Sequence, residues 1–332
     1  SVIRRAGPIA VAALLLLAGA GAFLLLRSEE GDATATDWGP LRLGVDSGGL
    51  AETLTEGGAP GYSTVWAGRW SVADDFREIR KAIEAAQARN VTPVVQWYYW
   101  GGDLTRQNVE HGANGKSRDE WFATADRLAR VIADATGNRA TFVVLETEFN
   151  HPDMVGWAPF DEALAAQARL FRAASPHVRI VLGFGSWNPE GWTTFQKAVE
   201  ASDLLGFQLM RSVERDTPLG LRSAHLAALD AAKNLHDRWP RKPLLLHDLA
   251  LSTYGHTSGE ALQKEAIDRI LAERETLRAL GCIGILYRGV RDYPDAPEGY
   301  YGEGEKHFGL KLADGTPKPA WDSWLKGLRQ NR

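Results

Sequence analysis

From residue 40 to its end, the chain alternates between short apolar runs and amphipathic segments, and this alternation limits the fold more than any other feature. Eight apolar runs have the length and composition of strands, and they span 41–47, 62–70, 92–100, 141–149, 179–187, 203–210, 242–251 and 282–290. Five intervening segments repeat their apolar residues at helical spacing, and they span 74–90, 118–138, 160–177, 221–239 and 261–281. Eight strand and helix units of this size predict a (β/α)8 barrel.

A doubly wound open sheet is the alternative fold for such an alternation. Dinucleotide-binding sheets of that kind carry a Gly-x-Gly-x-x-Gly loop after the first strand, and residues 44–52 (GVDSGGLAE) lack this pattern. The region also shows no internal repeat. We therefore interpret residues 40–332 as one barrel domain, and we expect no cofactor.

The charge balance and the cysteine count narrow the classes of function. The 332 residues carry a formal net charge of -4 and no cluster of Lys or Arg, so nucleic acid is not an expected partner. The single cysteine, Cys282, cannot form an intrachain disulfide, and its place in an apolar run predicts a buried strand residue.

The N-terminal end differs from the rest of the chain. Residues 7–26 are uncharged and apolar over a length that spans a bilayer, and the arginines before them favour an N-terminus in the cytoplasm. We predict a single-pass anchor in the inner (cytoplasmic) membrane over residues 1–27, a polar linker over 28–39, and an extracytoplasmic or periplasmic barrel. A cleaved signal peptide is the alternative. The lipid bilayer would then be one partner, and the small residues 18–22 would let the helix pack against another membrane protein.

The fourth apolar run ends in a cluster of polar residues. Glu146, Glu148, Asn150 and His151 lie where a buried strand is expected to leave the core. In a (β/α)8 barrel that end of each strand is where catalytic groups lie. All four residues are therefore candidates for contact with a substrate.

The sequence leaves two roles possible for Glu146, one in the site beside Glu148 and one in a structural ion pair. The two-residue period of a strand puts Glu146 and Glu148 on one face, so both are expected to point into the barrel and to push their pKa values apart. The alternative for Glu146 is an ion pair with an inward arginine, such as Arg69 or Arg211.

The other strand ends add aromatic, amide and charged side chains to the same rim. The further candidates for substrate binding are Asp46, Trp66, Trp97, Tyr99, Trp187, Gln208, Tyr287 and Arg288. Seven of the twelve tryptophans lie in or just after the second to fifth strands, at positions 66, 70, 97, 100, 157, 187 and 192. Indole rings stack on the C–H faces of sugars while carboxylates and amides bind hydroxyl groups, so this rim indicates a poly- or oligosaccharide partner.

Three motifs resemble a known group of enzymes. The sequence Glu148-Phe149-Asn150, followed by Trp157, resembles the fourth-strand motif of family 26 glycoside hydrolases, the β-mannanase group, in which the Glu is the acid/base. Residues 242–253 (KPLLLHDLALST) resemble the seventh strand of the wider clan of retaining barrel hydrolases, and residues 307–324 resemble its last strand exit and closing helix. The resemblance implies hydrolysis of a glycosidic bond by two carboxylates.

One position departs from that pattern. Asp248, preceded by His247, stands where the clan has a nucleophilic Glu. Asp is one methylene shorter, and the carboxyl groups lie roughly 5–5.5 Å apart in retaining enzymes and roughly 6.5–9.5 Å apart in inverting ones. Three interpretations stay open: a retaining enzyme that uses Asp, an inverting enzyme with Asp248 as base, and a barrel that has lost catalysis.

The expected roles follow from these positions. Glu148 would be the general acid, with a pKa raised by its surroundings, and Asp248 the ionised nucleophile or water-activating base. Asn150 would hold a ring hydroxyl group. Tyr287 and Arg288 would orient Asp248, since a charged donor beside a carboxylate keeps it ionised.

Other functions remain possible from the sequence. Glu146 and Glu148 could act in a substrate-assisted scheme, and Asp46, Glu148, His151, His247 and Asp248 could together form a metal site. A non-catalytic barrel could bind carbohydrate or serve as an accessory subunit of a membrane complex. The loop at residues 102–119 is long and polar enough to form a substrate wall or a partner-docking surface.

Overall fold

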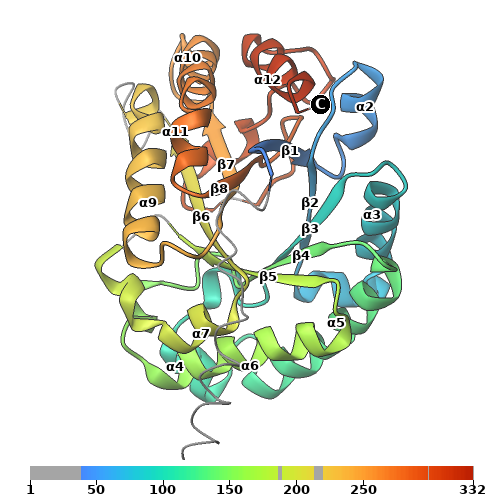
Figure 1. Ribbon diagram of the computed structural model, residues 1–332, viewed down its shortest axis with the longest axis vertical. Helices are drawn as coiled ribbons and strands as arrows, with labels where there is room; N and C mark the ends of the chain where they lie inside the picture. Colours follow the sequence, from blue (N-terminus) through green and yellow to red (C-terminus); the bar gives the residue numbers. More distant parts are fainter. Residues whose placement is uncertain (1–38, 186–188, 213–219, 298, 332) are drawn as a thin grey trace, which may run out of the picture.

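The computed structural model of the protein describes residues 39–185, 189–212, 220–297 and 299–331. Within them, eight parallel strands close into a barrel in sequence order, with β8 paired to β1 (Figure 1). The strands are β1 (Arg42–Asp46), β2 (Tyr62–Ala67), β3 (Thr92–Trp97), β4 (Thr141–Leu145), β5 (Val178–Phe184), β6 (Leu204–Ser212), β7 (Leu244–Ser252) and β8 (Cys282–Tyr287). The predicted (β/α)8 barrel is confirmed, and the open sheet is excluded.

Helices surround the barrel, as Figure 1 shows. They are α2 (Leu50–Thr55), α3 (Arg77–Gln87), α4 (Arg106–His111), α5 (Arg118–Thr136), α6 (Ala158–Ala174), α7 (Gln196–Ala201), α9 (Ala224–Arg238), α10 (Gly259–Ala272), α11 (Arg274–Ala279) and α12 (Pro319–Arg329). Short 3-10 helices occupy several loops: η2 (Arg69–Asp74), η3 (Gly101–Asp103), η4 (Pro152–Met154), η5 (Pro189–Thr194) and η6 (Glu303–His307). Each predicted helical segment overlaps a helix, and the last overlaps both α10 and α11, although α6 and α10 each begin two residues earlier than predicted.

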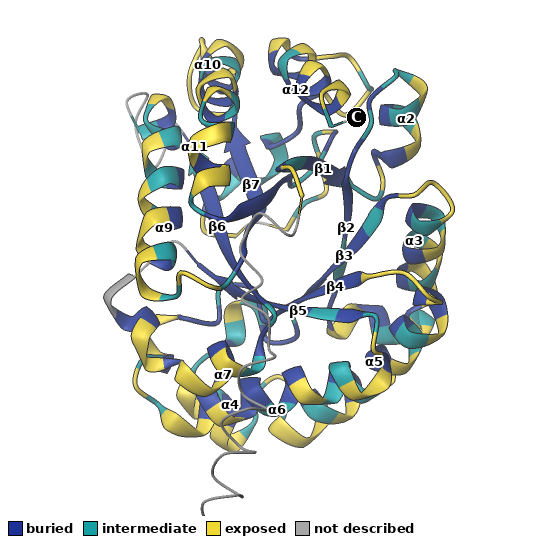
Figure 2. Cartoon of the chain, in the orientation of Figure 1, coloured by how far each residue is buried: buried dark blue, intermediate teal, exposed yellow. Residues whose placement is uncertain are grey.

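The burial of the strands explains their apolar composition. Every residue of β4, β7 and β8 is buried, as expected for parallel strands with side chains inside the barrel on one face and helices on the other. Figure 2 shows the buried strands at the centre and exposed residues on the outer faces of the helices. In α3 the buried residues Ile79, Ile83 and Ala86 repeat at helical spacing and form the face that packs on the barrel.

Two apolar layers follow from the alternation of side chains along each strand. One cluster joins residues from β2 to β8 inside the barrel: Tyr62, Val94, Phe142, Val144, Val181, Leu204, Leu245, Ile283 and Leu286. A much larger cluster lies between the strands and the helices. Cys282 is buried in β8, as its apolar surroundings predicted. Whether a strand residue reaches the inner space therefore depends on its position in the two-residue period.

The end of β4 differs from the prediction. The strand stops at Leu145, four residues earlier than expected, and the chain turns sharply. Glu146 and Glu148 both adopt a positive φ, of 36° and 68°, which side-chain-bearing residues rarely do. The two glutamates consequently do not share a strand face, and the expectation that both point into the barrel is wrong for Glu146.

The described part of the segment between β8 and α12, residues 288–297 and 299–318, packs against the carboxyl end of β7. The Ser252 hydroxyl on β7 donates to the Gly304 carbonyl in η6 at 2.9 Å. The ammonium of Lys318, just before α12, pairs with Asp292 at 2.7 Å, and both side chains are buried. This pair ties the two ends of the segment together and fixes η6 at the mouth of the barrel.

The predicted anchor at residues 7–26 and nearly all of the linker lie outside the described residues. Among the residues from 39 onward that the structure describes, no helix is both long and apolar enough to cross a membrane.

Candidate active site

Glu148 lies at the mouth of the barrel, just beyond the end of β4. Its backbone N–H donates to the Gly183 carbonyl at 3.2 Å, and the Tyr98 hydroxyl donates to its Oε2 at 3.4 Å. Burial raises the pKa of Glu148 to about 7, and the negative charges of Asp248 and Glu305 act in the same direction against the positive charge of Arg288. Glu148 therefore carries a proton in a large fraction of molecules near neutral pH.

Asp248 lies on β7 and is 1% exposed. The Arg288 guanidinium donates Nε to Oδ1 at 2.9 Å and Nη2 to Oδ2, while Gln208 Nε2 donates to Oδ2 at 2.7 Å. Burial alone would raise the pKa of Asp248, but the charge and hydrogen bonds of Arg288 more than offset it and hold this pKa below its usual value. The structure therefore brings Gln208 and Arg288 to Asp248 and keeps the carboxylate ionised.

A third carboxylate, that of Glu305 in η6, lies in the same place. Glu148, Asp248, Arg288 and Glu305 together form the charged cluster. Its Oε2 lies 3.7 Å from Arg288 Nη1, and the Tyr301 N–H donates to its Oε1 at 3.3 Å. Sequence reasoning missed Glu305 because it follows no strand and belongs to no periodic pattern. Only the fold of the segment after β8 brings it to the site.

Aromatic rings enclose the arginine of this cluster. The Arg288 guanidinium lies 5.2 Å from the ring centroid of Trp66 and 5.6 Å from that of Phe308. The Tyr98 ring packs edge-to-face on Trp66, with centroids 5.8 Å apart. Trp66 thus lies in the site as predicted from the end of β2, whereas Tyr98 and Phe308 were not predicted.

Trp97 and Tyr99 do not line this space. Trp97 is fully buried between the barrel and α6, where its Nε1 donates to Gln167 at 3.2 Å. Tyr99 is 1% exposed and packs on Trp97 and Trp100. Since Gln96 points inward, the strand period selects Tyr98 as the next inward residue, and counting the alternation from Gln96 would have found it.

Tyr287 is displaced from the site for the same reason. Its ring lies against Trp324 of α12, with centroids 5.4 Å apart, and its hydroxyl donates to the Phe308 carbonyl at 3.0 Å. The expectation that Tyr287 orients Asp248 is therefore wrong, and the next residue, Arg288, performs that task.

Glu146 is a buried structural carboxylate. It accepts hydrogen bonds from the Tyr99 N–H at 3.0 Å, the Trp100 N–H at 3.3 Å and the Trp121 indole at 2.8 Å. Arg69, one predicted ion-pair partner, contacts Glu120 instead. Burial raises the pKa of Glu146 to about 7 against the opposing effect of these donors. Glu146 thus joins the exit of β3 to α5, and contact with a substrate is not supported.

Asp46 and Asn150 bind the backbone of neighbouring loops. Asp46 accepts the N–H groups of Gly49 at 3.0 Å and Val290 at 2.7 Å, which joins the exits of β1 and β8. The buried Asn150 amide exchanges two hydrogen bonds with the backbone of Gly185. Both oxygens of Asp46 and the amide of Asn150 are therefore engaged in holding loops, and the predicted contact between Asn150 and a ring hydroxyl is not supported.

The remaining candidates do not converge on the carboxylates. His151 is exposed on the loop after β4, and Trp187 lies outside the described residues. His247 is buried inside the barrel, next to the space left by Gly183 and Gly206, and burial lowers its pKa to about 4. Within the described part of the chain, no three or more His, Cys, Asp or Glu side chains form a group that could hold a metal ion.

Comparison with family models and with the sequences of curated proteins finds no match. Solved structures do match. GH5_18 from Streptomyces cattleya in complex with GlcNAc has a TM-score of 0.63 and 17% identity, over 88% of this chain and 80% of that one. The Cellulomonas fimi endo-beta-1,4-mannanase double mutant has a TM-score of 0.61 and 12% identity, over 88% and 71%. A fungal beta-1,4-galactanase has a TM-score of 0.60 and 13% identity, over 87% and 99%.

These matches establish the fold. The chain has a (β/α)8 barrel similar to those of the structural neighbours named above. They belong to more than one group, and none stands apart in its score, so the specific resemblance to family 26 is not shown by the fold.

Proposed function

We propose that the protein is a glycoside hydrolase that cleaves a poly- or oligosaccharide with Glu148 as general acid and Asp248 as its ionised partner. The observation that carries this proposal is the contrast between two carboxyl groups at one barrel mouth: Asp248 is held by Arg288 and Gln208, whereas Glu148 is bound by the Tyr98 hydroxyl. Burial raises the pKa of Glu148 to about 7, and Arg288 holds the pKa of Asp248 below its usual value. One protonated and one ionised carboxyl group are what acid-assisted glycoside cleavage requires.

The chemistry assigns each group a proton or a charge. Glu148 gives its proton to the glycosidic oxygen as the bond from that oxygen to the anomeric carbon breaks, and the ionised Asp248 stabilises the positive charge that develops on the ring. In a retaining reaction Asp248 then bonds to the anomeric carbon, and a water molecule displaces it while giving its proton to the now ionised Glu148. In an inverting reaction Asp248 instead takes a proton from the attacking water. Proton NMR of the first anomer released distinguishes the two.

A non-catalytic carbohydrate-binding barrel is the second candidate. It is favoured by the enclosure of Asp248, which is 1% exposed and accepts hydrogen bonds on both oxygens from Arg288 and Gln208. In the described ranges, Asp248 Oδ2 accepts two hydrogen bonds and Oδ1 accepts one, so Oδ1 alone keeps a lone pair for an anomeric carbon or a water molecule. Under this alternative the pair of Asp248 and Arg288 would serve only to shape the barrel mouth.

The location of the protein is part of the proposal. Residues 7–26 would anchor it in the inner membrane, and the barrel would act on the outer side of that membrane. The substrate would then be a polysaccharide of the envelope or its surroundings.

The test is an assay for new reducing ends. The full chain in detergent is incubated with mannans, glucans, xylans, galactans and envelope polysaccharides, beside Glu148→Gln and Asp248→Asn. Loss of one catalytic carboxyl group is expected to lower the rate by about 10²–10⁴-fold. The matched control is Glu303→Gln, which removes an exposed carboxylate of η6. Binding without cleavage by the wild type would favour the non-catalytic barrel.

A further inference from the structure

A cavity of about 660 Å³ opens beside the charged cluster, at the exits of β2 and β3. Its wall includes Arg69, Trp70, Tyr98, Gly102, Lys116 and Glu120. Tyr98 connects it to the catalytic carboxyl group, since the same side chain that lines the cavity donates its hydroxyl to Glu148. Tyr98 is therefore shared between the wall of the cavity and the hydrogen bond to Glu148.

Trp70 gives the cavity an exposed aromatic surface. The side chain is 58% exposed although it is the largest apolar type, and it lies against Gly68. A Cβ at residue 68 would lie 2.2 Å from the indole Cζ3, so only glycine lets the ring rest on the backbone there. Trp70 thus rests on the backbone at Gly68, lines the cavity and keeps exposed aromatic surface on which a sugar ring can stack.

The polar side chains of the wall are fixed and nearly balanced in charge. Lys116 Nζ binds the Trp100 carbonyl at 2.6 Å and Asp103 at 2.8 Å. Arg69 binds the Asn114 carbonyl at 3.0 Å and lies 3.7 Å from Glu120. Since each cation already has an anionic neighbour, the wall offers hydrogen bonds without a strong net field, which suits a neutral, hydroxyl-rich ligand better than an anion.

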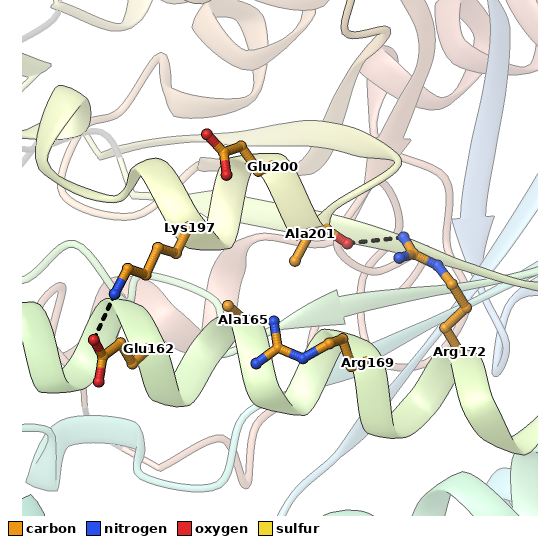
Figure 3. Close-up of a pocket in the computed structure, with 7 residues that line it drawn as sticks. All are labelled: Glu162, Ala165, Arg169, Arg172, Lys197, Glu200 and Ala201. Atoms are coloured by element: carbon orange, nitrogen blue, oxygen red, sulfur yellow. Dashed lines mark hydrogen bonds and ion pairs between the residues drawn. The ribbon is translucent and has the colours of Figure 1, made fainter. Parts of the chain in front are cut away.

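A second hollow shows the contrast. It lies between α6 and α7 on the flank of the barrel, has a volume of about 550 Å³ and is lined mainly by charged side chains (Figure 3). Lys197 there pairs with Glu162, and Arg172 donates to the Ala201 carbonyl. Its lining contains no aromatic ring, and it shares no residue with the charged cluster.

We propose that the cavity at Trp70 is a binding subsite for neutral sugar units further along the chain that Glu148 cleaves. The volume lies in the range of about 300–1,000 Å³ that small-molecule ligands occupy. The proposal rests on the proposed function, because it assumes that Glu148 cleaves the bound sugar chain. It implies that the substrate is an oligosaccharide or polysaccharide of several linked sugars and not a short glycoside. Gly102 and Lys116, which line the cavity, belong to the loop at residues 102–119. Under this proposal the loop forms a substrate wall and not a partner-docking surface.

The experiment measures affinity against chain length. Neutral manno-, cello- and galacto-oligosaccharides of two to six units are titrated calorimetrically into the full chain carrying Glu148→Gln, with and without Trp70→Ala. We expect Trp70→Ala to weaken binding of the longest bound series by about fivefold to tenfold, which corresponds to about 1–1.4 kcal/mol, and to leave binding of the disaccharide unchanged. Leu226→Ala is the control, since Leu226 is an apolar residue on α9 that is 52% exposed, and this change should alter neither affinity.

The outcomes separate this inference from the proposed function. A loss confined to long chains supports the subsite even if the wild-type protein cleaves none of them. Equal effects of Trp70→Ala on all lengths, or no effect on any, would overturn the subsite even if the wild type is an active hydrolase. Failure of every oligosaccharide in the series to bind would also overturn it.

Discussion

Glu146 and Glu148 are separated by one residue, yet their surroundings give them different tasks. Three N–H donors surround the Glu146 carboxylate, whereas Glu148 faces Tyr98 and the charged cluster. In Glu146→Gln an amide NH₂ would replace one acceptor and meet an N–H donor. We expect this change to lower the free energy of unfolding by about 1–3 kcal/mol.

Chemical denaturation measures this difference. Glu148→Gln serves as the comparison, because no backbone N–H of the residues that the structure describes donates to its carboxyl group. Its unfolding free energy should stay within about 0.5 kcal/mol of the wild type. If both variants lost stability equally, Glu146 would not have the distinct structural role assigned to it.

The pH dependence of cleavage depends on the proton of Glu148. Because its pKa is raised to about 7, the acid form is populated below that pH, and the rate should fall as pH rises through it. Glu305 contributes to this shift through its negative charge, and it also shares Arg288. Glu305→Gln should therefore lower the pKa of Glu148 and move the alkaline limb to lower pH. A pH–rate profile whose alkaline limb stays in place would show that Glu305 does not act on Glu148.

At the scale of residues, the sequence predicted where the site lies more accurately than it predicted which residues form it. Glu148, Asp248, Gln208, Arg288 and Trp66 were predicted from strand ends, and the structure brings them together. Trp97 and Tyr287 were chosen by residue type, and each lies one position away from the inward residue. The alternation of side chains along each strand decides which residue points inward, and residue type alone does not reveal it.

Among the elements, the end of β4 is where the sequence pattern misled. The predicted strand extends to Phe149, beyond the end of the continuous apolar run at Leu145. Instead the positive φ values at Glu146 and Glu148 reverse the direction of successive side chains. Such a backbone is held by tertiary contacts, in this case the donors around Glu146, and a local period cannot predict it.

The segment from β8 to α12 is held by a buried ion pair, and this gives an element-scale prediction. Lys318→Met would leave the buried Asp292 carboxylate without its ammonium partner. We expect a loss of about 3–5 kcal/mol in unfolding free energy and faster amide hydrogen exchange at residues 303–308. Lys264→Met breaks an exposed pair on α10 and should cost less than about 1 kcal/mol. Unchanged exchange in η6 would mean that other contacts position Glu305.

For the whole molecule, the barrel followed from the number, spacing and type of the apolar runs. All eight strands were predicted, because the strands of a closed parallel barrel are buried on both faces and appear in the sequence as apolar runs. Most errors lie at the ends of the strands. The site was harder to predict, since Glu305 and Phe308 reach it through a segment that has no regular period.

The N-terminal segment carries a prediction about the whole chain. If residues 7–26 form a bilayer-spanning helix, the protein should remain in the membrane fraction after an alkaline carbonate wash. A variant that lacks residues 1–27 should appear in the soluble fraction with its activity intact. Release of the full chain by the wash would argue against the anchor.

The most direct measurement compares two substrates that differ only in their leaving group, once the panel has identified the sugar. A natural glycoside needs a proton on its leaving oxygen, whereas a dinitrophenyl glycoside of the same sugar leaves without one. With Glu148 as the acid, Glu148→Gln should lose about 10²–10⁴-fold on the natural glycoside and little on the activated one. An equal loss on both substrates, or no loss on either, would contradict the assignment of Glu148 as the general acid.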